Sequence, residues 1–328
     1  MNYRKLAERA ILGKVPSLKE AQELINTKDE NTFELISSAN IIIKEFKGNK
    51  VKLCAIVNAK SGRCSENCSF CAQSAHHKTN APVYPLLKDK EIFDAAKASE
   101  KNMKATCFSI VTSGKSILNK DELKEIGSAI FQIKNKTNLN RCVSLGILNK
   151  EQIKQLKSNG LKRLHHNLET AKSFFENICT THTYEERLNT IKSAKEEGLE
   201  ICSGGIFGLG ETLNQRLELA YTLKQLEVES APINILNPIP NTPAAKNYSP
   251  LSPLEVLRLI AVYRFILPKA DIGVFGGREL SLKNLQPLMF IAGANVTLIG
   301  NYLVTKGQTP NKDLQMIKDL GLEIEKHD

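Results

Sequence analysis

The feature that most constrains the fold is an alternation, repeated eight times, of short β-branched runs with longer charged segments. The short runs have the length of buried strands, and the segments between them have the periodicity of amphipathic helices. Several of these helices would end at a glycine just before the next strand, as at Gly160 and Gly198. The expected strands are 51–57, 103–111, 139–146, 161–167, 199–206, 231–236, 270–275 and 295–299, and the expected helices include 89–101, 119–134, 184–197, 212–226, 252–267 and 281–292.

Strand–helix units in such a series predict an α/β fold, a parallel (β/α)8 barrel of the TIM type. A doubly wound sheet is less favoured, because no GxGxxG motif follows the first expected strand. Residues 1–47 would form an N-terminal helical extension, 48–305 the barrel and 306–328 a C-terminal helical tail. Because no linker rich in Pro, Gly or Ser divides the chain, we expect a single domain.

Composition and charge narrow the class of protein. The 328 residues are 41% hydrophobic and 24% charged, as in ordinary globular enzymes. No run approaches the roughly 18 to 20 apolar residues of a membrane span, and the first residues lack the apolar core of a signal peptide. The net charge of +10 comes with singly spread lysines, 6% aromatic residues and no Trp, which argues against a nucleic-acid partner. We expect a cytoplasmic protein without a membrane segment.

The cysteines carry the strongest chemical signal. In a reducing cytoplasm, clustered thiols indicate metal or redox chemistry rather than disulfides. Cys64, Cys68 and Cys71 follow the first expected strand, in the segment NAKSGRCSENCSFCAQSAHH. Three thiolates on one loop can bind three irons of a cubane cluster and leave the fourth iron free for a small chelating molecule. In a barrel this loop lies on the C-terminal face, where active sites are built.

A structural zinc site is the alternative interpretation of this loop. The three cysteines would be joined by His76 or His77 as the fourth ligand. Zinc sites usually arrange their thiols as two short pairs, so the triplet favours the cluster.

The triplet and its position are similar to those of the radical S-adenosylmethionine (SAM) superfamily. From about residue 10 to 322 the chain resembles the biotin synthase family in the order and spacing of HHNLET, TYEERLNTIKSAKEEGLEICSGGIFGLGET, PINIL, GGRE and FIAGAN. The resemblance implies a sulfurtransferase that inserts sulfur into dethiobiotin, with a [4Fe–4S] cluster and SAM bound at the triplet. It also implies a homodimer and a small reductant protein such as flavodoxin or ferredoxin.

Three further cysteines, Cys107, Cys142 and Cys202, lie on the second, third and fifth expected strands. Side chains alternate along a strand, so periodicity alone leaves it open whether any one of them faces the barrel interior or is an ordinary buried thiol. The resemblance implies that these three hold an auxiliary iron–sulfur cluster that donates the sulfur, which gives them a catalytic role.

The chain departs from the family at one ligand of this auxiliary cluster. Family members usually carry an arginine four residues before the glycine of GRE, and Gly273 stands there in this chain. Cys54 or Cys179 could supply a thiolate instead, or a water, sulfide or small thiol could complete the site. The third alternative is a larger, sulfide-bearing cluster in place of [2Fe–2S]. We favour this hypothesis at the level of sequence, because a glycine would clear space for cluster atoms.

The resemblance also implies residues that bind the two organic ligands. His165, Asn167 and Asn234 would contact the substrate, and amide side chains suit its ureido ring because they both donate and accept hydrogen bonds. The SAM-binding residues would be Phe70 against the adenine, Glu169 on the ribose, Arg187 on the carboxylate, and the loop of Gly208 and Gly210 close to the cofactor.

Two alternatives to this function stay open. The chain could be another radical SAM enzyme of the same subgroup, such as a maturase-type protein, or a non-catalytic iron–sulfur or zinc protein. The interior cysteines together with Asn167 and Asn234 argue against the first. The roles of Cys54, Cys179 and Arg278 cannot be assigned from the sequence.

Overall fold

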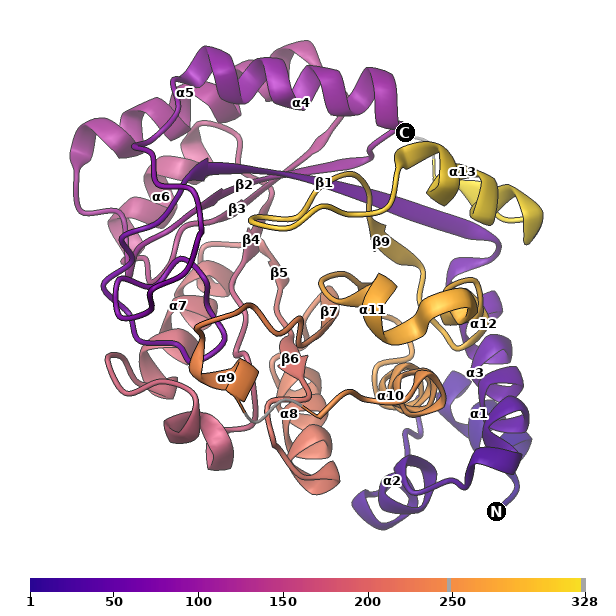
Figure 1. Ribbon diagram of the computed structural model, residues 1–328. Helices are drawn as coiled ribbons and strands as arrows, with labels where there is room; N and C mark the ends of the chain where they lie inside the picture. The colour runs from indigo at the N-terminus through magenta and orange to yellow at the C-terminus, as the bar shows by residue number, and fades with distance from the viewer. Residues whose placement is uncertain (247–248, 326–328) are drawn as a thin grey trace.

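The computed structural model describes residues 1–246 and 249–325. Its parallel strands close into an eight-stranded barrel (Figure 1). The strands are β1 (Lys50–Lys60), β2 (Cys107–Thr112), β3 (Asn140–Ser144), β4 (Arg163–His165), β5 (Glu200–Cys202), β6 (Gly205–Phe207), β7 (Ser230–Ile235), β8 (Asp271–Val274), β9 (Val296–Leu298) and β10 (Glu323–Ile324).

The barrel closes where β9 pairs back with β1. Going round the sheet, the order is β1, β2, β3, β4, β5, β7, β8 and β9, and Lys52 of β1 lies opposite Val296 of β9. Each expected strand has a counterpart in this order, so the prediction of a (β/α)8 barrel is confirmed. The short strand β10 adds to the outer end of β1, with Glu323 opposite Lys50, which the sequence did not predict.

The expected strand 199–206 is divided into two pieces, β5 and β6, and both pair with β7. Between these pairings β7 carries Pro232, which has no N–H to donate. A Cβ on Gly204 would lie 1.9 Å from the carbonyl oxygen of Pro232. The glycine therefore permits a close approach of two backbones at the point where the strand is interrupted.

Helices surround the barrel, and the first of them precede strand β1 in the chain. They are α1 (Tyr3–Ile11), α2 (Leu18–Ile25), η1 (Asp29–Asn31), α3 (Thr32–Lys47), α4 (Asp89–Met103), α5 (Lys120–Lys136), α6 (Lys150–Ser158), η2 (Lys172–Asn177), α7 (Tyr184–Glu196), α8 (Leu213–Gln225), α9 (Pro243–Lys246), α10 (Pro253–Ile266), α11 (Arg278–Leu282), η3 (Lys283–Leu285), α12 (Leu288–Ile291) and α13 (Pro310–Asp319).

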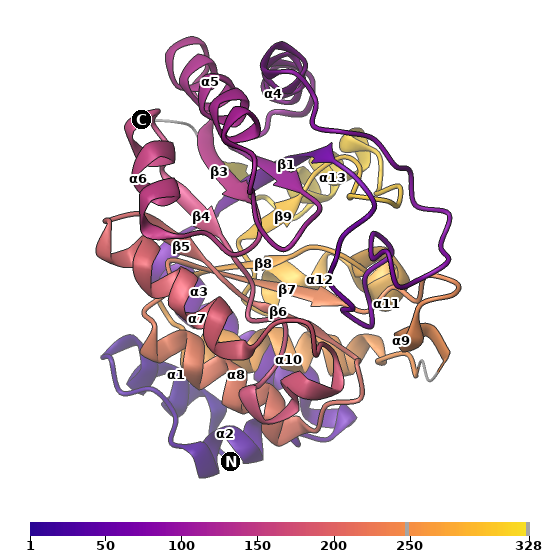
Figure 2. The same ribbon diagram turned by 90° about the vertical axis from the view of Figure 1, so that its left-hand side faces the viewer.

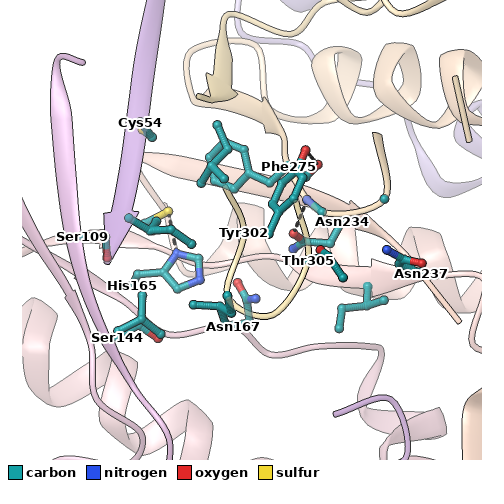
Figure 3. A pocket seen from close by; sticks show the side chains of 18 of the residues that line it. Cys54, Ser109, Ser144, His165, Asn167, Asn234, Asn237, Phe275, Tyr302 and Thr305 are labelled. Carbon is teal, nitrogen blue, oxygen red and sulfur yellow. Dashed lines mark hydrogen bonds between the residues drawn. The ribbon is translucent and has the colours of Figure 1, made fainter. Parts of the chain in front are cut away.

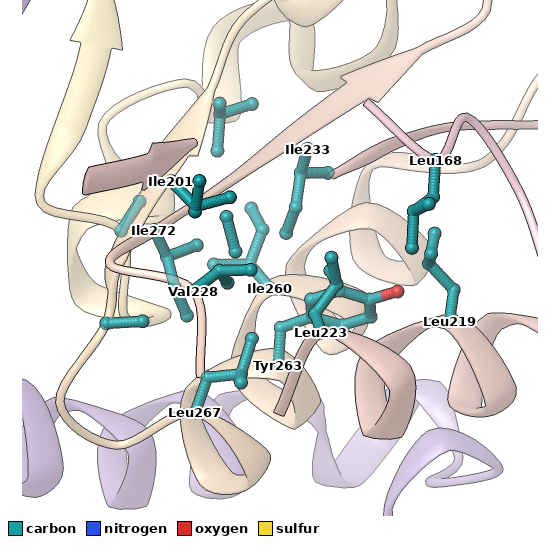
Figure 4. Close-up of a cluster of buried hydrophobic side chains, with 14 of the residues drawn as sticks. Leu168, Ile201, Leu219, Leu223, Val228, Ile233, Ile260, Tyr263, Leu267 and Ile272 are labelled. Atoms are coloured by element: carbon teal, nitrogen blue, oxygen red, sulfur yellow. The ribbon is translucent and has the colours of Figure 1, made fainter. Parts of the chain in front are cut away.

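Helix α10 lies between the barrel and the N-terminal helices. Its sequence, PLEVLRLIAVYRFI, is apolar on every side, and such a helix has to be covered all round. It contacts β8 on one side and α2 and α3 on the other (Figures 1 and 2). Ile260 and Tyr263 of α10 pack with Leu223 of α8 and with Ile233 and Ile272 of the barrel strands (Figure 4). The N-terminal helices thus cover the outside of the barrel, while the division into 1–47, 48–305 and 306–328 stays a prediction.

The expected helix over 281–292 is wrong. The chain forms three short pieces instead, α11, η3 and α12. Lys283 has a left-handed backbone with φ of 49°, which ends α11, and Pro287 cannot donate a helical hydrogen bond. Within 1–246 and 249–325, the structure has no helix that is both long and apolar enough to span a membrane.

Candidate active site

Two adjoining cavities lie at the carboxyl ends of the barrel strands. The barrel cavity, with a volume of about 350 Å³, lies inside the barrel (Figure 3). The loop cavity, with a volume of about 200 Å³, is lined by the loop that follows β1. The residues that line both cavities are Phe70, Val111, Ser144, His165, Asn167, Glu169 and Leu303.

The thiols of Cys64, Cys68 and Cys71 all line the loop cavity. The loop that carries them is held by backbone hydrogen bonds, from the Cys64 amide to the Gln73 carbonyl at 3.0 Å and from the Cys71 amide to the Cys68 carbonyl at 3.0 Å. None of the three forms a disulfide. Burial raises the pKa of the Cys71 thiol to about 11, so a bound cation would be needed to keep it ionised at neutral pH. This set of donors fits an iron–sulfur cluster.

The histidines of the zinc alternative lie elsewhere. The His76 ring nitrogen Nε2 is 2.9 Å from the Ser65 carbonyl, and the His77 Nε2 is 3.0 Å from the Cys68 carbonyl. Neither ring lines the loop cavity. The triplet therefore has no histidine from its own loop beside it as a fourth ligand.

Arg187, Glu169 and Asn167 lie together at the loop cavity. The Arg187 guanidinium donates to the Asn167 carbonyl at 2.9 Å and lies 3.4 Å from the Glu169 carboxylate. The Asn167 amide donates to Glu169 at 3.3 Å, and its oxygen accepts from the Gly204 amide at 3.1 Å. One cation and one carboxylate are thus fixed beside the cysteine triplet. Phe70 lies on the wall between the two cavities.

A second group of side chains surrounds Cys68, and the sequence did not predict it. The Cys179 thiol lies 3.7 Å from the Cys68 thiol and 3.2 Å from Nδ1 of His182. His182 Nδ1 is also 2.5 Å from the Glu66 carboxylate. Cys68, Cys179 and His182 lie close enough together to hold a metal ion, but such an ion would compete with the triplet for Cys68. No local spacing could have indicated a contact across 111 residues.

The barrel cavity is lined by Cys107, Cys142 and Cys202, so all three of these cysteines border one space. They come from β2, β3 and β5, and each is buried. Register explains their proximity, because Cys142 lies opposite Ser109, two residues after Cys107 and on the same face of β2. Their role as cluster ligands stays a prediction.

Cys54 also lines the barrel cavity, and the sequence left it unassigned. It lies opposite Cys107 in the pairing of β1 with β2. A sequence signal existed, because Leu53 and Ala55 on either side of it are buried apolar residues that face the opposite side of the strand. Figure 3 labels Cys54 on β1, at one edge of the group of side chains that line the cavity.

Gly273 does not open space in the barrel cavity. A Cβ on Gly273 would lie 2.6 Å from a ring carbon of Phe275, two residues further along on the same face. The Phe275 ring itself lines the cavity. The Phe275 ring thus occupies the space beside Gly273 in this structure, and the larger cluster stays a prediction.

Polar side chains at the barrel cavity are held by fixed partners. The Asn234 amide donates to the Gly205 carbonyl at 3.2 Å and accepts from the Gly276 amide at 3.0 Å. His165 Nδ1 lies 3.2 Å from the Cys202 thiol. Burial lowers the pKa of His165, which makes its imidazole neutral at neutral pH. These groups offer hydrogen bonds without a net charge.

Comparison with known proteins decides the family. The chain is 50% identical to biotin synthase of Geotalea daltonii, over 99% of this chain and 98% of that protein. It is 46% identical to biotin synthase of Clostridium acetobutylicum, over 98% of each chain. The chain belongs to the biotin synthase family.

Family models and solved structures agree with this membership of the biotin synthase family. Residues 59–223 match the Radical SAM superfamily, and residues 232–323 match the Biotin and Thiamin Synthesis associated domain. Methylornithine synthase (PylB) shares the fold with a TM-score of 0.84 at 17% identity, covering 98% of each chain. The maturase HydG shares it with a TM-score of 0.84 at 20% identity, covering 99% of this chain and 75% of that one.

As a member of the biotin synthase family, the chain is a radical SAM sulfurtransferase. This confirms the predicted enzyme class, the [4Fe–4S] cluster with SAM, and an auxiliary iron–sulfur cluster. The composition of the auxiliary cluster depends on which of the four cysteines of the barrel cavity bind iron.

Gly208 and Gly210 line neither cavity, so the predicted approach of this loop to SAM stays a prediction. The structure shows a tight turn, in which both glycines have positive φ. The buried Glu211 carboxylate closes the turn by accepting from the amides of Gly208 at 3.0 Å and Leu209 at 2.8 Å. Arg216 in turn donates to Glu211 at 2.7 Å.

The GGRE motif supports a segment that closes one side of the barrel cavity. Glu279 accepts from the Tyr302 hydroxyl at 2.9 Å and from the Gln308 amide at 3.0 Å. Tyr302 and the three residues after it line the cavity. Arg278 is buried and lies 2.9 Å from Asp313 of α13. The motif thus connects β8 with residues 302–305 at the cavity and with the C-terminal helix α13.

Proposed function

We propose that this member of the biotin synthase family inserts sulfur into dethiobiotin, with SAM in the loop cavity and the substrate in the barrel cavity. The observation that carries this assignment is the shared lining of the two cavities, which puts the cysteine triplet and the interior cysteines on either side of one space. A [4Fe–4S] cluster with SAM supplies the radical chemistry that an unactivated C–H bond requires.

Cys64, Cys68 and Cys71 would hold the SAM cluster. Beside them, Arg187 would pair with the SAM carboxylate, because a guanidinium fork fixes orientation as well as charge. Glu169 would accept hydrogen bonds from the ribose hydroxyls, and Phe70 would lie against the adenine. Support comes from the position of all these residues around the loop cavity.

Asn167, Asn234 and His165 would orient dethiobiotin in the barrel cavity. Each amide can donate to the ureido carbonyl or accept from its N–H groups. The neutral imidazole of His165 suits an uncharged ring, since a buried charge without a partner would be costly. The apolar side chains of the cavity would exclude water from the reacting carbon.

Cys107, Cys142 and Cys202 would hold the auxiliary cluster that donates sulfur. Their thiols face the cavity that would hold the substrate, which keeps the sulfur source within reach of the reacting carbons. The type of cluster, [2Fe–2S] or larger, is not fixed by these three residues.

We further propose a cytoplasmic homodimer that receives electrons from a flavodoxin or ferredoxin. Family membership supports the dimer and the electron donor, and eight cysteines without a disulfide suit a reducing compartment. Light scattering would measure the oligomeric state, and reduction of the SAM cluster by purified flavodoxin would test the donor.

The test of the function is an anaerobic assay of reconstituted protein with SAM, a strong reductant and dethiobiotin, followed by mass spectrometry. We expect biotin together with 5′-deoxyadenosine. Deoxyadenosine without biotin would indicate another substrate, such as that of a related radical SAM enzyme. The absence of both products from protein with a loaded SAM cluster would contradict the proposal.

A further inference from the structure

We propose that Cys54 supplies a fourth thiolate to the iron–sulfur cluster of the barrel cavity, joining Cys107, Cys142 and Cys202. This inference rests on the proposed function, because it concerns the cluster that donates sulfur. It replaces the sequence-based hypothesis that space at Gly273 admits a larger cluster.

The position of Cys54 is the first argument. Among residues 1–246 and 249–325, the cysteines that line the barrel cavity are these four. Cys54 and Cys107 are direct neighbours in the register of β1 and β2, where adjacent strands are about 4.8 Å apart. None of the four forms a disulfide, so each thiol is free to bind iron.

Strand register also brings the cysteines together. Cys54 of β1 lies opposite Cys107 of β2, and Cys142 of β3 lies opposite Ser109, two residues after Cys107 on the same face of β2. Cys202 faces the same cavity from β5, and His165 lies 3.2 Å from it. Cys54 is therefore one of a group of cysteines that border the same cavity rather than a lone thiol.

No residue of β8 (Asp271–Val274) lines the barrel cavity, so this strand supplies no competing ligand there. Gly273 has no side chain to donate, and the Phe275 ring fills the adjacent space with carbon. The hydroxyls of Ser109 and Ser230 also line the cavity, but thiolates are the softer ligands that iron–sulfur clusters select. Three cysteines leave one ligand position of such a cluster unfilled, and Cys54 would fill it.

Charge is the fourth argument, because a fourth thiolate adds a negative charge to a buried site. Arg163 of β4 lines the cavity and is only 8% exposed. Its guanidinium is always charged and donates to the Glu200 carboxylate at 2.7 Å. Because Glu200 already pairs with this cation, Arg163 offsets only part of the charge that a further thiolate adds.

The experiment uses a parent protein that carries Cys64→Ala, Cys68→Ala and Cys71→Ala. This parent cannot hold the SAM cluster, so the iron that it binds would belong to the auxiliary cluster. Iron, acid-labile sulfide, visible absorption and Mössbauer spectra are measured after anaerobic reconstitution. We expect Cys54→Ala to keep less than about half of the parent's iron, since one of four ligands is lost. Cys54→Ser should keep iron but shift the absorption to shorter wavelength, because an alkoxide is a harder ligand than a thiolate.

Matched variants control for the loss of any cysteine. Cys179→Ala, outside the barrel cavity, should leave the iron content and the spectra unchanged, and Cys107→Ala should lose as much iron as Cys54→Ala. Circular dichroism checks the fold, and the serine variant decides the result if the alanine variant does not fold.

Two outcomes would overturn the proposal, and they are distinguishable. If both Cys54 variants match the parent in iron, absorption and Mössbauer parameters, Cys54 is not a ligand and the proposed function stands. If the parent itself takes up no iron, the barrel cavity holds no cluster, and the proposed sulfur source fails together with the Cys54 assignment.

Discussion

The thiol of Cys179 lies 3.7 Å from the thiol of Cys68, in a chain where 111 residues separate the two. This contact joins a predicted ligand of the SAM cluster to a cysteine outside the triplet. Contact with Cys68 and a hydrogen bond with His182 lower the pKa of the Cys179 thiol, so it ionises readily. An ionised thiol beside a second thiol is the arrangement from which a disulfide forms.

We expect a Cys68–Cys179 disulfide when cluster-free protein is treated with diamide. Iron bound to Cys68 should prevent this bond, so reconstituted protein should resist it. Peptide mapping by mass spectrometry without reduction would identify the linked peptides, and Cys179→Ala serves as the control. A Cys64–Cys71 link with both Cys68 and Cys179 alkylated would show that the 3.7 Å contact does not direct oxidation.

Replacement of Arg187 tests the predicted contact with the SAM carboxylate. Arg187→Lys keeps the charge but loses the planar fork, and a hydrogen bond to a charged group contributes about 1.5–3 kcal/mol. We therefore expect the KM for SAM to rise about tenfold or more, while the iron content stays constant. Lys192→Ala, an exposed residue of the same helix, is the matched control. An unchanged KM would remove Arg187 from the SAM site.

The barrel could be predicted from the sequence because its strands are buried on both faces and therefore appear as short apolar runs. The break between β5 and β6 could not, since it coincides with Pro232 on a neighbouring strand. The helix expected over 281–292 failed for a local reason. Its apolar residues suggested one helix, but Lys283 adopts a positive φ and Pro287 follows soon after.

The candidate site was predictable where a motif or a strand position carries the information. The triplet is contiguous. Alternation along β1 puts Cys54 on the face opposite Leu53 and Ala55, but only the structure shows that this face is the inner one. The neighbours of Cys68 depend on contacts between distant segments, so Cys179 and His182 were missed. For the same reason no role could be assigned to Arg278 from the sequence, because its partner Asp313 lies in the C-terminal helix.

The ion pair of Arg278 and Asp313 predicts a large stability effect from a residue that touches neither cavity. Their side chains are 1% and 0% exposed. Without Asp313, Arg278 keeps Glu279 at 3.2 Å as its remaining carboxylate, so the loss is that of one hydrogen bond to a charged group, about 1.5–3 kcal/mol. Asp313→Ala should lower the free energy of unfolding by about this amount in denaturant titrations. Glu8→Ala, which breaks the exposed pair with Arg4, should change it little. Equal effects of the two variants would contradict the prediction.

Asp271 at the start of β8 predicts a specific loss of stability in acid. Its carboxylate lies 2.9 Å from Lys47 and 2.7 Å from Lys52 and accepts from Asn295 at 2.8 Å. Burial alone would raise the pKa of Asp271, but the two lysines lower it well below its ordinary value. An aspartate whose pKa is lower in the folded than in the unfolded chain stabilises the fold fully above the unfolded pKa, about 3.9.

This stabilisation should therefore disappear progressively as the pH falls below about 4 towards the folded pKa. Asp271→Asn should unfold more easily at pH 7, by about 3 kcal/mol, because two lysines lose their counter-charge. The difference between the two proteins should shrink as the pH falls, since the unfolded wild-type chain takes up a proton at Asp271 that the folded chain does not. Free energies of unfolding measured from pH 7 down to pH 3 would check this. A difference that stays constant over that range would mean that the carboxylate charge does not stabilise the barrel.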